Sequence, residues 1–548
     1  MDARVDDRRH RCHRRVQGVV DRQRRPAPRP RTHDDGTSPV TRARTTLVVT
    51  IVLALLVGIA VYAAIATRDD STFSAPKPVD APAPQGLERF YDQKVDWTSC
   101  DGARCAWVTV PIDYAKPDGD TTRIRVKVHP GKNAKRSLFV NPGGPGGSAI
   151  DFSDRMVSEF GPNVRDMYDI VGVDPRGVGE SSPLKCLPPT QFDAFVATDP
   201  DPDDDAEVTA LRESSETMGA ACLKNSGPLA AHVSTVEVAR DMDVVRALLG
   251  RSKLDWFGAS YGTQLGAVYA ELFPDTVGRM VLDGAVDPTL DAVESSFAQT
   301  TGFQRALEAY AKDCVKKSDC PIGDDAEAGM AKIADLLKQL DENPLKLRDG
   351  RQLTEGNAFY GVAVTLYDQE TWTYLTQALR AAFAGDGSVL MILSDTYFDR
   401  QQDGSYATNG GQVIYAVNCL DAGGKGLSVA ETKAQLPRFE KASPVFGSAL
   451  GWGALGCSDW PIKAANPLPD IDAKGAPPIL VVGTTRDPAT PYESAQALAS
   501  QLDSGVLLTR EGDGHTAYVS GNRCIVEAVD TYLVKGTPPK DGTVCKES

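Results

Sequence analysis

The turn around Ser260 constrains the fold of this chain more than any other feature, because it joins a strand pattern to a helix pattern. The apolar residues before it are typical of a short buried strand: Leu254, Trp256 and Phe257. Those after it recur at helical spacing on one face: Leu265, Val268, Tyr269 and Leu272. Pro274 then predicts the end of this helix.

The residues at this turn, Gly258-Ala-Ser-Tyr-Gly262, form a G-x-S-x-G motif. In so tight a turn the serine takes a strained backbone conformation, which lifts its hydroxyl above the sheet edge. Glycine is needed on both sides, because a Cβ there would collide with neighbouring backbone. The motif alone is equally compatible with a nucleophilic serine and with an ordinary glycine-rich turn, so the rest of the chain must decide.

Strand-like and helix-like segments alternate along most of the chain. Strand patterns are predicted at 123–129, 137–141, 168–174, 279–283, 478–483 and 505–509. A helix is predicted from Thr235 to Leu249, with Ser234 as its N-cap and Glu237 completing a capping box. This alternation predicts an α/β fold in which a mostly parallel sheet carries helices on both faces.

The alternation breaks between residues 287 and 459, where long helices are predicted at 297–314, 326–340 and 371–383. We expect this helical insertion to form a lid over the carboxyl edge of the sheet. The core would then have a first part at 89–286 and a second part at 460–548. A Pro- and Ala-rich linker is expected at 68–88.

The N-terminal region predicts export. Residues 1–44 hold 13 Arg against 6 Asp and are expected to be a disordered basic tail. Residues 45–67 carry no charge and are long enough to span a bilayer, with the Arg-rich side in the cytoplasm. Ala64-Ile-Ala66 also offers a cleavage site, so a signal peptide and a membrane anchor both remain open. The protein would be secreted or attached to the cell envelope, and would contact the membrane only through this segment.

Ten of the eleven cysteines follow the hydrophobic segment, an even number that predicts disulfides in an exported chain. Pairing neighbours in order gives five plausible loops, although the sequence does not fix the connectivity. These cysteines are Cys100, Cys105, Cys186, Cys222, Cys314, Cys320, Cys419, Cys457, Cys524 and Cys545.

Composition argues against several kinds of partner. The formal net charge of the whole chain is −15. The first 44 residues contribute +7, so the remainder carries about −22, which disfavours nucleic-acid binding. The chain lacks C-x-x-C pairs and histidine clusters, and the acidic run at 198–207 lacks the spacing and central glycine of a calcium loop. We therefore expect a solvated loop at this run, no metal, no cofactor, and a monomer.

A serine hydroxyl needs a base, and histidine has a suitable pKa. In α/β-hydrolases the order along the chain is Ser, then Asp or Glu, then His. Among the three histidines beyond the hydrophobic segment, only His515 follows Ser260, in a loop just after the last predicted strand. Asp487, after the strand before it, is predicted to orient the imidazole. Asp513 is the alternative acid if Asp487 pairs with Arg486 instead.

An oxyanion hole requires backbone N–H donors. One is expected from Tyr261, the residue after the nucleophile. The other is expected from Gly144, in the glycine loop Asn141-Pro-Gly-Gly-Pro-Gly-Gly-Ser148 that follows an earlier strand. A phosphate-binding loop is the alternative for such glycines, but the required Gly-Lys-Ser/Thr is absent.

From about residue 90 to its end, the chain resembles the exported tripeptidyl/prolyl aminopeptidase branch of the α/β-hydrolases of actinobacteria. Besides the glycine loop and the serine motif, the matching stretches are Cys105-Ala-Trp-Val-Thr-Val-Pro-Ile-Asp-Tyr114, Asp174-Pro-Arg-Gly-Val-Gly-Glu-Ser181, Val417-Asn-Cys-Leu-Asp421, Cys457-Ser-Asp-Trp-Pro461 and Asp487-Pro-Ala-Thr-Pro491. The resemblance implies a serine exopeptidase acting on peptides with free N-termini. Pro142 stands where prolyl aminopeptidases have a histidine, which favours the tripeptidyl type.

Two other functions remain open from the sequence. The same triad can serve a carboxylesterase or lipase, and the scaffold can belong to a non-catalytic envelope binding protein. An exopeptidase must bind the ammonium group of its substrate, which requires a carboxylate in a partly desolvated pocket. Asp421 is the candidate, with Glu271 as its alternative, and a turn aspartate is an equally compatible role for Asp421.

Overall fold

The computed structural model describes residues 76–79, 82–423, 426–464 and 466–546. The predictions for the basic tail, the hydrophobic segment and the start of the linker lie outside the described residues. In the part of the chain that is described, no helix is both long and apolar enough to cross a membrane.

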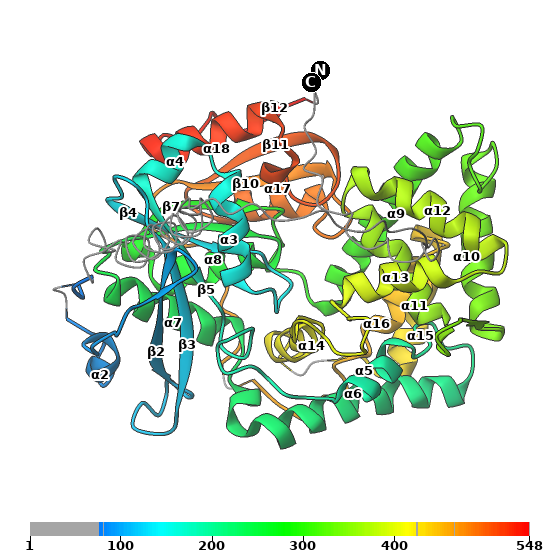
Figure 1. Cartoon of the computed structure of the whole chain (residues 1–548), viewed down its shortest axis with the longest axis horizontal. Coiled ribbons are helices and arrows are strands. Elements are labelled where there is room, and N and C mark those ends of the chain that lie inside the picture. The colour runs from blue at the N-terminus through cyan, green and yellow to red at the C-terminus, as the bar shows by residue number, and fades with distance from the viewer. Residues whose placement is uncertain (1–75, 80–81, 424–425, 465, 547–548) are drawn as a thin grey trace, which may run out of the picture. The chain divides into compact units, whose positions relative to one another are not determined.

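A ten-stranded sheet forms the centre of the fold (Figure 1). The first three pairings along its order (β1-β2, β2-β3 and β3-β5) are antiparallel, and all the others are parallel. In sheet order the strands are β1 (Thr98–Cys100), β2 (Ala103–Pro111), β3 (Thr121–His129), β5 (Tyr168–Val173), β4 (Arg136–Asn141), β6 (Leu254–Ala259), β7 (Val277–Asp283), β10 (Ile479–Arg486), β11 (Gly505–Asp513) and β12 (Thr543–Cys545). This mostly parallel sheet confirms the predicted α/β-hydrolase fold.

How much of each strand is buried depends on whether the strand lies at the centre or near the edge of the sheet. All six residues of β6 are buried, because a central parallel strand is covered on both faces. β3 instead alternates exposed and buried residues over its first half, as expected near an antiparallel edge. The predicted strands therefore appear at the expected places, with bounds that differ by a few residues.

Helices cover both faces of the sheet. Phe257 packs in a buried cluster with residues of α3 (Ala149–Glu159) and α18 (Arg523–Lys535). Its neighbour Trp256 points to the opposite face, where its indole N–H donates to Gly262 O at 3.0 Å at the start of α8 (Tyr261–Leu272). Successive side chains of one strand thus hold helices on opposite faces. The other helices around the sheet are α2 (Glu88–Tyr91), α4 (Pro162–Met167), α7 (Thr235–Leu248) and α17 (Tyr492–Gln501).

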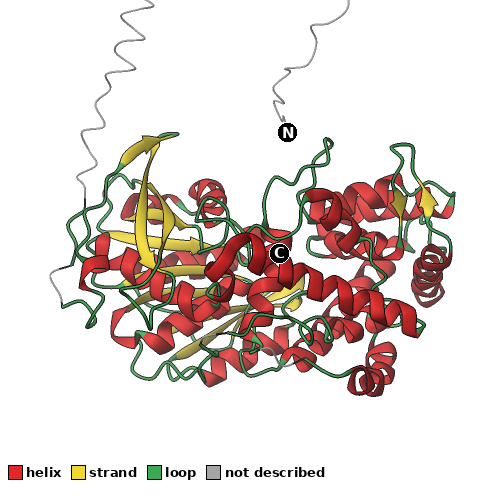
Figure 2. Cartoon of the chain, turned by 90° about the horizontal axis from the view of Figure 1, so that it is seen from below, coloured by secondary structure: helices red, strands yellow, loops and turns green. Residues whose placement is uncertain are grey.

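Between β7 and β10 the chain is helical and adds no strand to the main sheet. Its helices have a buried core of their own, which includes Phe303, Leu337, Leu379 and Phe446. They gather beside the sheet in the views of Figures 1 and 2. The elements are α9 (Ala292–Cys314), α10 (Ala326–Glu342), β8 (Leu345–Lys346), β9 (Gln352–Leu353), α11 (Glu355–Ala363), α12 (Trp372–Phe383), α13 (Ser388–Tyr397), α14 (Gly410–Asp421), α15 (Val429–Ala442) and α16 (Gly447–Gly453). We call these residues, 287–459, the lid.

The lid also contacts helices that precede it in the chain. These are α5 (Pro189–Val196) and α6 (Asp205–Ser226). Val208 of α6 is buried against Trp452 and Leu455 of the lid. The ring of Phe192, in α5, packs against Phe398 and Tyr406, so two segments far apart in the sequence share an interface.

The ten described cysteines form five disulfides, each joining neighbours in sequence. The pairs are Cys100–Cys105, Cys186–Cys222, Cys314–Cys320, Cys419–Cys457 and Cys524–Cys545. The prediction of disulfides is confirmed, and the structure supplies the connectivity that the sequence left open.

The disulfides are expected to contribute unequally to stability, because loop-closure entropy grows with loop length. Cys186–Cys222 spans 36 residues and Cys314–Cys320 spans 6. Replacing the first pair by alanine should cost about 4 kcal/mol of unfolding free energy, against about 2 kcal/mol for the second. Denaturant unfolding of the two double variants measures the difference. Equal losses, or more than two free thiols by mass spectrometry of the protein purified without reductant, would contradict this account.

Candidate active site

Ser260 lies between β6 and α8 with φ 55° and ψ −126°, a backbone conformation that non-glycine residues rarely adopt. A Cβ at Gly258 would collide with the carbonyl oxygen of Gly262, which explains the glycine before the serine. One at Gly262 would lie 2.8 Å from Asn141 O. The local geometry is therefore the strained turn that the motif predicts.

His515 and Asp487 are hydrogen-bonded to each other at the carboxyl ends of β11 and β10. The imidazole Nδ1 lies 2.9 and 3.0 Å from the two carboxylate oxygens. Asp487 is completely buried and also accepts hydrogen bonds from the backbone N–H groups of Ala489, Thr490 and Thr516. With Nδ1 facing the carboxylate, Nε2 of His515 is the ring nitrogen left to act as a base.

The pKa of His515 reflects two opposed effects. Burial lowers the pKa of the imidazole, and the neighbouring Asp487 carboxylate raises it by more, so the net pKa lies above the usual value. A carboxylate that stabilises the imidazolium is what a general base requires when it takes a proton during the reaction.

The alternative acid is engaged elsewhere. The guanidinium of Arg486 contacts both carboxylate oxygens of Asp513, at 2.6 and 2.7 Å. Asp487, although adjacent to Arg486 in the chain, faces His515 instead. This arrangement favours Asp487 over Asp513 as the orienting acid.

Ser260 and His515 both lie close to the end of β7. The N–H of Ser260 donates to Asp283 O, and a Cβ on the next residue, Gly284, would lie 3.4 Å from Cε1 of His515. No direct hydrogen bond joins the Ser260 hydroxyl to His515 within the described residues. Such contacts are commonly loose before substrate binds.

Asp283 is a residue that the sequence analysis missed. Its buried carboxylate accepts the N–H groups of Ala517 and Tyr518, two and three residues after His515. Burial raises its pKa to about 6. Asp283 therefore anchors the loop that carries the histidine. The only sequence signal is an acidic residue at the end of an apolar strand, which is too common to be informative.

The glycine loop lies directly against the nucleophile turn. A Cβ at Gly143 would come within 2.8 Å of both Ser260 Cβ and Tyr261 N. The N–H of Gly143 is taken by Asn141 Oδ1. In the described part of the chain, neither the N–H of Gly144 nor that of Tyr261 donates to a protein acceptor, so both are available for an oxyanion.

The segment Asp174–Ser181 supports the glycine loop. The carboxylate of Asp174 accepts from Ser148 Oγ, Ile150 N and Glu180 N, which ties the start of α3 to this segment. Since Ser148 is the last residue of the glycine loop, the loop is fixed at its C-terminal end.

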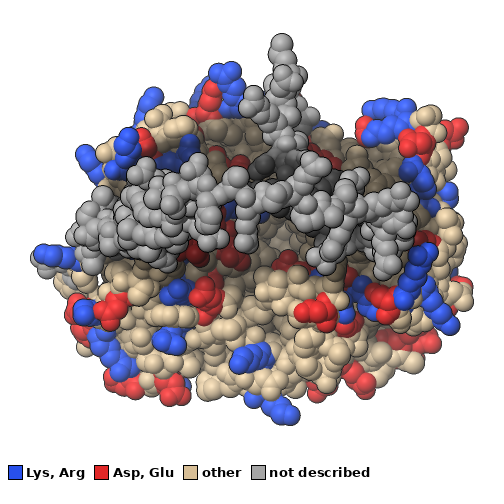
Figure 3. Space-filling view, in the orientation of Figure 1, with Lys and Arg blue, Asp and Glu red and all other residues tan. Residues whose placement is uncertain are grey.

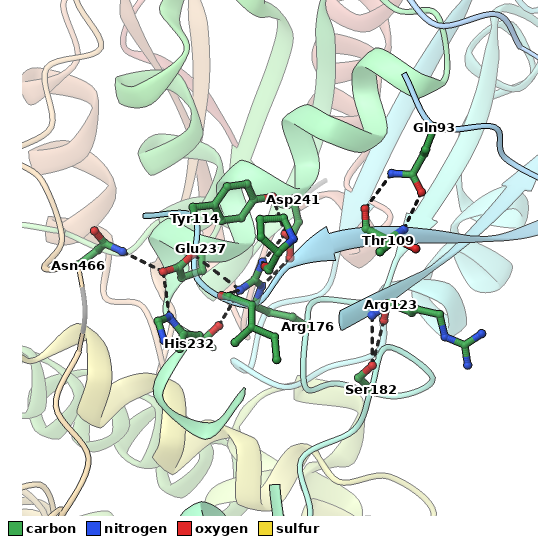
Figure 4. Close-up of polar contacts among 12 residues, drawn as sticks. Gln93, Thr109, Tyr114, Arg123, Arg176, Ser182, His232, Glu237, Asp241 and Asn466 are labelled. Atoms are coloured by element: carbon green, nitrogen blue, oxygen red, sulfur yellow. Dashed lines mark hydrogen bonds and ion pairs between the residues drawn. The ribbon is translucent and has the colours of Figure 1, made fainter. Parts of the chain in front are cut away.

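Arg176 of the same segment is buried and binds the carboxylate of Asp241 in α7 through two nitrogens, at 2.6 and 2.8 Å (Figure 4). The same guanidinium donates to three carbonyl oxygens, those of Pro111, Ile112 and His232. The phenol of Tyr114 adds a further hydrogen bond to Asp241. Arg176 therefore joins the segment to α7 and to the end of β2.

The predicted capping box at the start of α7 is wrong. Ser234 is the N-cap, but its side chain makes no capping bond. The Glu237 carboxylate instead accepts from Asn466 and lies 3.3 Å from His232 Nδ1 (Figure 4). The first helical N–H, of Thr235, donates to Asp421 of the lid. Tertiary partners have replaced the local cap.

Asp421, the predicted ammonium ligand, lies at the end of α14 and close to the nucleophile turn. Its carboxylate accepts from the N–H and hydroxyl of Thr235, at 3.0 and 2.5 Å, and from Gln264 Nε2 at 3.1 Å. The Thr235 hydroxyl is also 2.6 Å from the phenol oxygen of Tyr261. All these donors are neutral, and burial raises the pKa of Asp421 to about 6.

The prediction that Glu271 binds substrate is corrected. Glu271 lies in the last turn of α8, roughly 15 Å along the helix from Ser260. Its carboxylate accepts the N–H groups of Asp472 and Ala473 at 2.9 and 2.8 Å, so it fixes a loop.

The lid contacts the histidine through Tyr367, another residue that the sequence did not single out. The carbonyl oxygen of Tyr367 accepts a hydrogen bond from the backbone N–H of His515 at 2.7 Å. The two rings pack edge to face, with their centroids 5.4 Å apart. Tyr360, Tyr397 and Phe398 continue the aromatic surface behind Tyr367.

A strained serine, a histidine paired with a buried acid and two available N–H donors are a set suited to acyl transfer. Residues 443–545 match the family model described as TAP-like protein. The serine protease Hip1 of Mycobacterium tuberculosis is 36% identical over 480 residues, which cover 83% of this chain and 91% of the relative. The chain belongs to the TAP-like family of serine hydrolases.

Two further relatives are named for different activities, one as an esterase and one as a peptidase. Carboxylesterase B of M. tuberculosis is 37% identical over 459 residues, covering 81% of this chain and 86% of the relative. The tripeptidyl aminopeptidase of Streptomyces coelicolor is 34% identical over 470 residues, covering 82% and 85%. Membership of this family makes the chain a serine hydrolase. The kind of bond that it cleaves, amide or ester, has to be inferred from the active site.

Proposed function

We propose that this chain is an exported serine peptidase that releases short peptides from free N-termini, of the tripeptidyl aminopeptidase type. The observation that carries the proposal is the hydrogen-bonded pair of His515 and Asp487 at the sheet edge where β6 ends in Ser260. The five disulfides support export, because such bonds persist in oxidising compartments. Both signs of charge are interspersed on the face seen in Figure 3, in keeping with peptides rather than nucleic acids as partners.

The mechanism follows from the roles of the three side chains. His515 Nε2 removes the hydroxyl proton of Ser260 as the oxygen attacks the scissile carbonyl carbon. The N–H groups of Gly144 and Tyr261 stabilise the negative charge on the carbonyl oxygen. The imidazolium then gives its proton to the leaving amine, and an acyl-enzyme remains. Water, deprotonated by the same imidazole, attacks the ester, and the proton returns to Ser260 as the acid product leaves.

The Asp421 carboxylate is proposed to bind the ammonium group of the substrate. The hydroxyl of Thr235 contacts both this carboxylate and the phenol oxygen of Tyr261, the residue after the nucleophile. It has no cationic partner among the described residues, and its side chain is well fixed by Thr235 and Gln264. A fixed carboxylate without a counter-charge near the scissile site is suited to select a free N-terminus.

Asp421→Asn is expected to raise KM for free peptides roughly 10- to 100-fold, because it removes one charge-assisted hydrogen bond. Hydrolysis of p-nitrophenyl acetate should remain unchanged, since that substrate has no ammonium group. N-acetylated peptides should be poor substrates of the unaltered enzyme for the same reason. Steady-state kinetics on matched free, acetylated and ester substrates measure all three effects.

Glu271→Gln is the matched control, because it neutralises a carboxylate of the same chain that binds only backbone N–H groups of a loop. Its KM values should equal those of the unaltered enzyme. Equal turnover of free and acetylated peptides would exclude an exopeptidase and assign an endopeptidase or esterase activity to the same triad.

A carboxylesterase is the second candidate, favoured by the 37% identity to Carboxylesterase B. The same triad and oxyanion donors serve an ester as well as an amide. A kcat/KM for simple acyl esters well above that for every free peptide tested would favour this candidate.

A further inference from the structure

Five aromatic side chains of the lid form a continuous group beside the triad. We call the group the aromatic belt, and its members are Tyr360, Tyr367, Tyr397, Phe398 and Tyr415. Neighbouring rings have centroids between 4.6 and 6.5 Å apart, and the hydroxyls of Tyr360 and Tyr415 are 3.0 Å apart. At one end, Tyr367 packs edge to face against the imidazole of His515. The belt therefore starts at the general base.

The other end of the belt is held against the glycine loop by α14. A Cβ at Gly146 would lie 2.8 Å from Gly410 O and 3.2 Å from Cβ of Val413, so the start of α14 touches the loop. Tyr415 follows Val413 by two residues. In Figure 1, α14 accordingly lies between the sheet and most of the other lid helices. The belt thus extends from the base toward the oxyanion donors, the two groups that flank a scissile carbonyl.

The four tyrosines of the belt are each partly exposed, although protein surrounds them. Burial raises the pKa of Tyr397 and of Tyr415 to about 12. It raises the pKa of Tyr360 and of Tyr367 well above the usual value. Rings that are strongly desolvated and still accessible face a recess rather than open solvent, which is the setting of a binding site.

The hydroxyls of the belt are paired with one another. Tyr360 bonds to Tyr415, and Tyr367 bonds to Tyr397. Among the residues that the structure describes, no charged side chain hydrogen-bonds to these phenols. Since the polar tips are paired, the ring surfaces remain to contact a ligand. Such a lining favours an apolar group, because a charged side chain would lose its hydration there without gaining a partner.

The length of α14 indicates which part of a peptide would lie at the belt. This helix carries Tyr415 near its middle and Asp421, the proposed ammonium ligand, at its end. The two residues are six positions apart, a rise of about 9 Å along the helix. Three residues of an extended peptide span about 10 Å. A peptide with its ammonium group at Asp421 would therefore bring its third side chain to the level of Tyr415.

We propose that the aromatic belt is the subsite for the residue that supplies the scissile carbonyl, and that it selects an apolar side chain, either aromatic or branched aliphatic. The inference rests on the proposed peptidase function, because it takes Asp421 as the site of the substrate ammonium group. The substrate class is then peptides whose third residue, immediately before the cleaved bond, is one such as phenylalanine or leucine.

The test compares fluorogenic tripeptide amides with free N-termini, which share two alanines and differ in the third residue. With phenylalanine or leucine as that residue, kcat/KM should be at least about 20-fold higher than with lysine or glutamate. Equal values, or a preference for lysine or glutamate, would overturn the inference and leave the proposed peptidase function intact. Failure to cleave any of the tripeptide amides would overturn the proposed function, and this inference with it.

Tyr415→Ala should lower the ratio of kcat/KM for the phenylalanine substrate to that for a trialanine substrate by about 10-fold, because the ring contact is lost. Tyr415→Phe keeps the ring and should keep the ratio. Tyr374→Ala is the matched control, because it removes a tyrosine of α12 that is 54% exposed, and the ratio should not change. If Tyr415→Ala does not fold, Tyr397→Ala serves with the same expectation. An unchanged ratio in the folded variant, including an equal loss on both substrates, would overturn the assignment.

Discussion

Replacing Ser260 by alanine is expected to lower kcat by roughly three or more orders of magnitude while leaving the fold unchanged. The Ser260 hydroxyl is the group proposed to form the acyl-enzyme, so its removal should prevent the first step of the reaction. Alanine fits the space, and it loses only the hydroxyl at the strained turn. Peptidase and esterase activity should fall together, and circular dichroism and the Tm should match those of the unaltered protein.

His515→Ala should be similarly inactive, and the double variant should be little worse than either single one, because the triad acts as a unit. Ser500→Ala is a suitable control, since this exposed serine of α17 bonds only to a carbonyl of its own helix. Retention of more than a tenth of the activity in Ser260→Ala would refute the assignment of the nucleophile.

Arg176→Met is expected to cost about 3 to 5 kcal/mol of unfolding free energy, the largest effect on stability of any single substitution considered for this chain. The variant would leave Asp241 and Glu237 buried without the guanidinium that faces both. Three backbone carbonyls would also lose their donor. Urea unfolding, followed by fluorescence, measures the loss.

Arg212→Met is the matched comparison, because Arg212 pairs with Asp459 at the surface with 45% of its side chain exposed. Exposed ion pairs contribute about 0 to 1 kcal/mol, so this variant should unfold almost like the unaltered chain. Similar losses in the two variants would mean that the buried guanidinium is not what holds the Asp174–Ser181 segment.

The parts of the fold that could be predicted are those encoded by short stretches of sequence. The turn at Ser260 and the strands around it depend on local periodicity and on two glycines. Asp487 and His515 follow recognisable strands, so their order along the chain predicted where they would lie. The pairing of Arg486 with Asp513 did not follow from sequence, because either aspartate is within reach of that arginine.

The remaining features depend on contacts between distant segments. Glu237 has the spacing of a capping residue, yet its carboxylate contacts the side chains of Asn466 and His232 instead of the helix N-terminus. The position of Glu271 away from Ser260 became clear only from the length of α8 and from the hydrogen bond to a loop about 200 residues later. Asp283 and Tyr367 each bind the His515 loop through interactions that leave no pattern in the sequence.

The bond between the Tyr367 carbonyl and the His515 N–H makes the general base depend on the lid. A chain whose lid has not docked lacks one of the contacts that hold this histidine, so full activity requires the lid as well as the sheet. A substitution far from the triad that loosens the lid should therefore lower activity through the position of the imidazole.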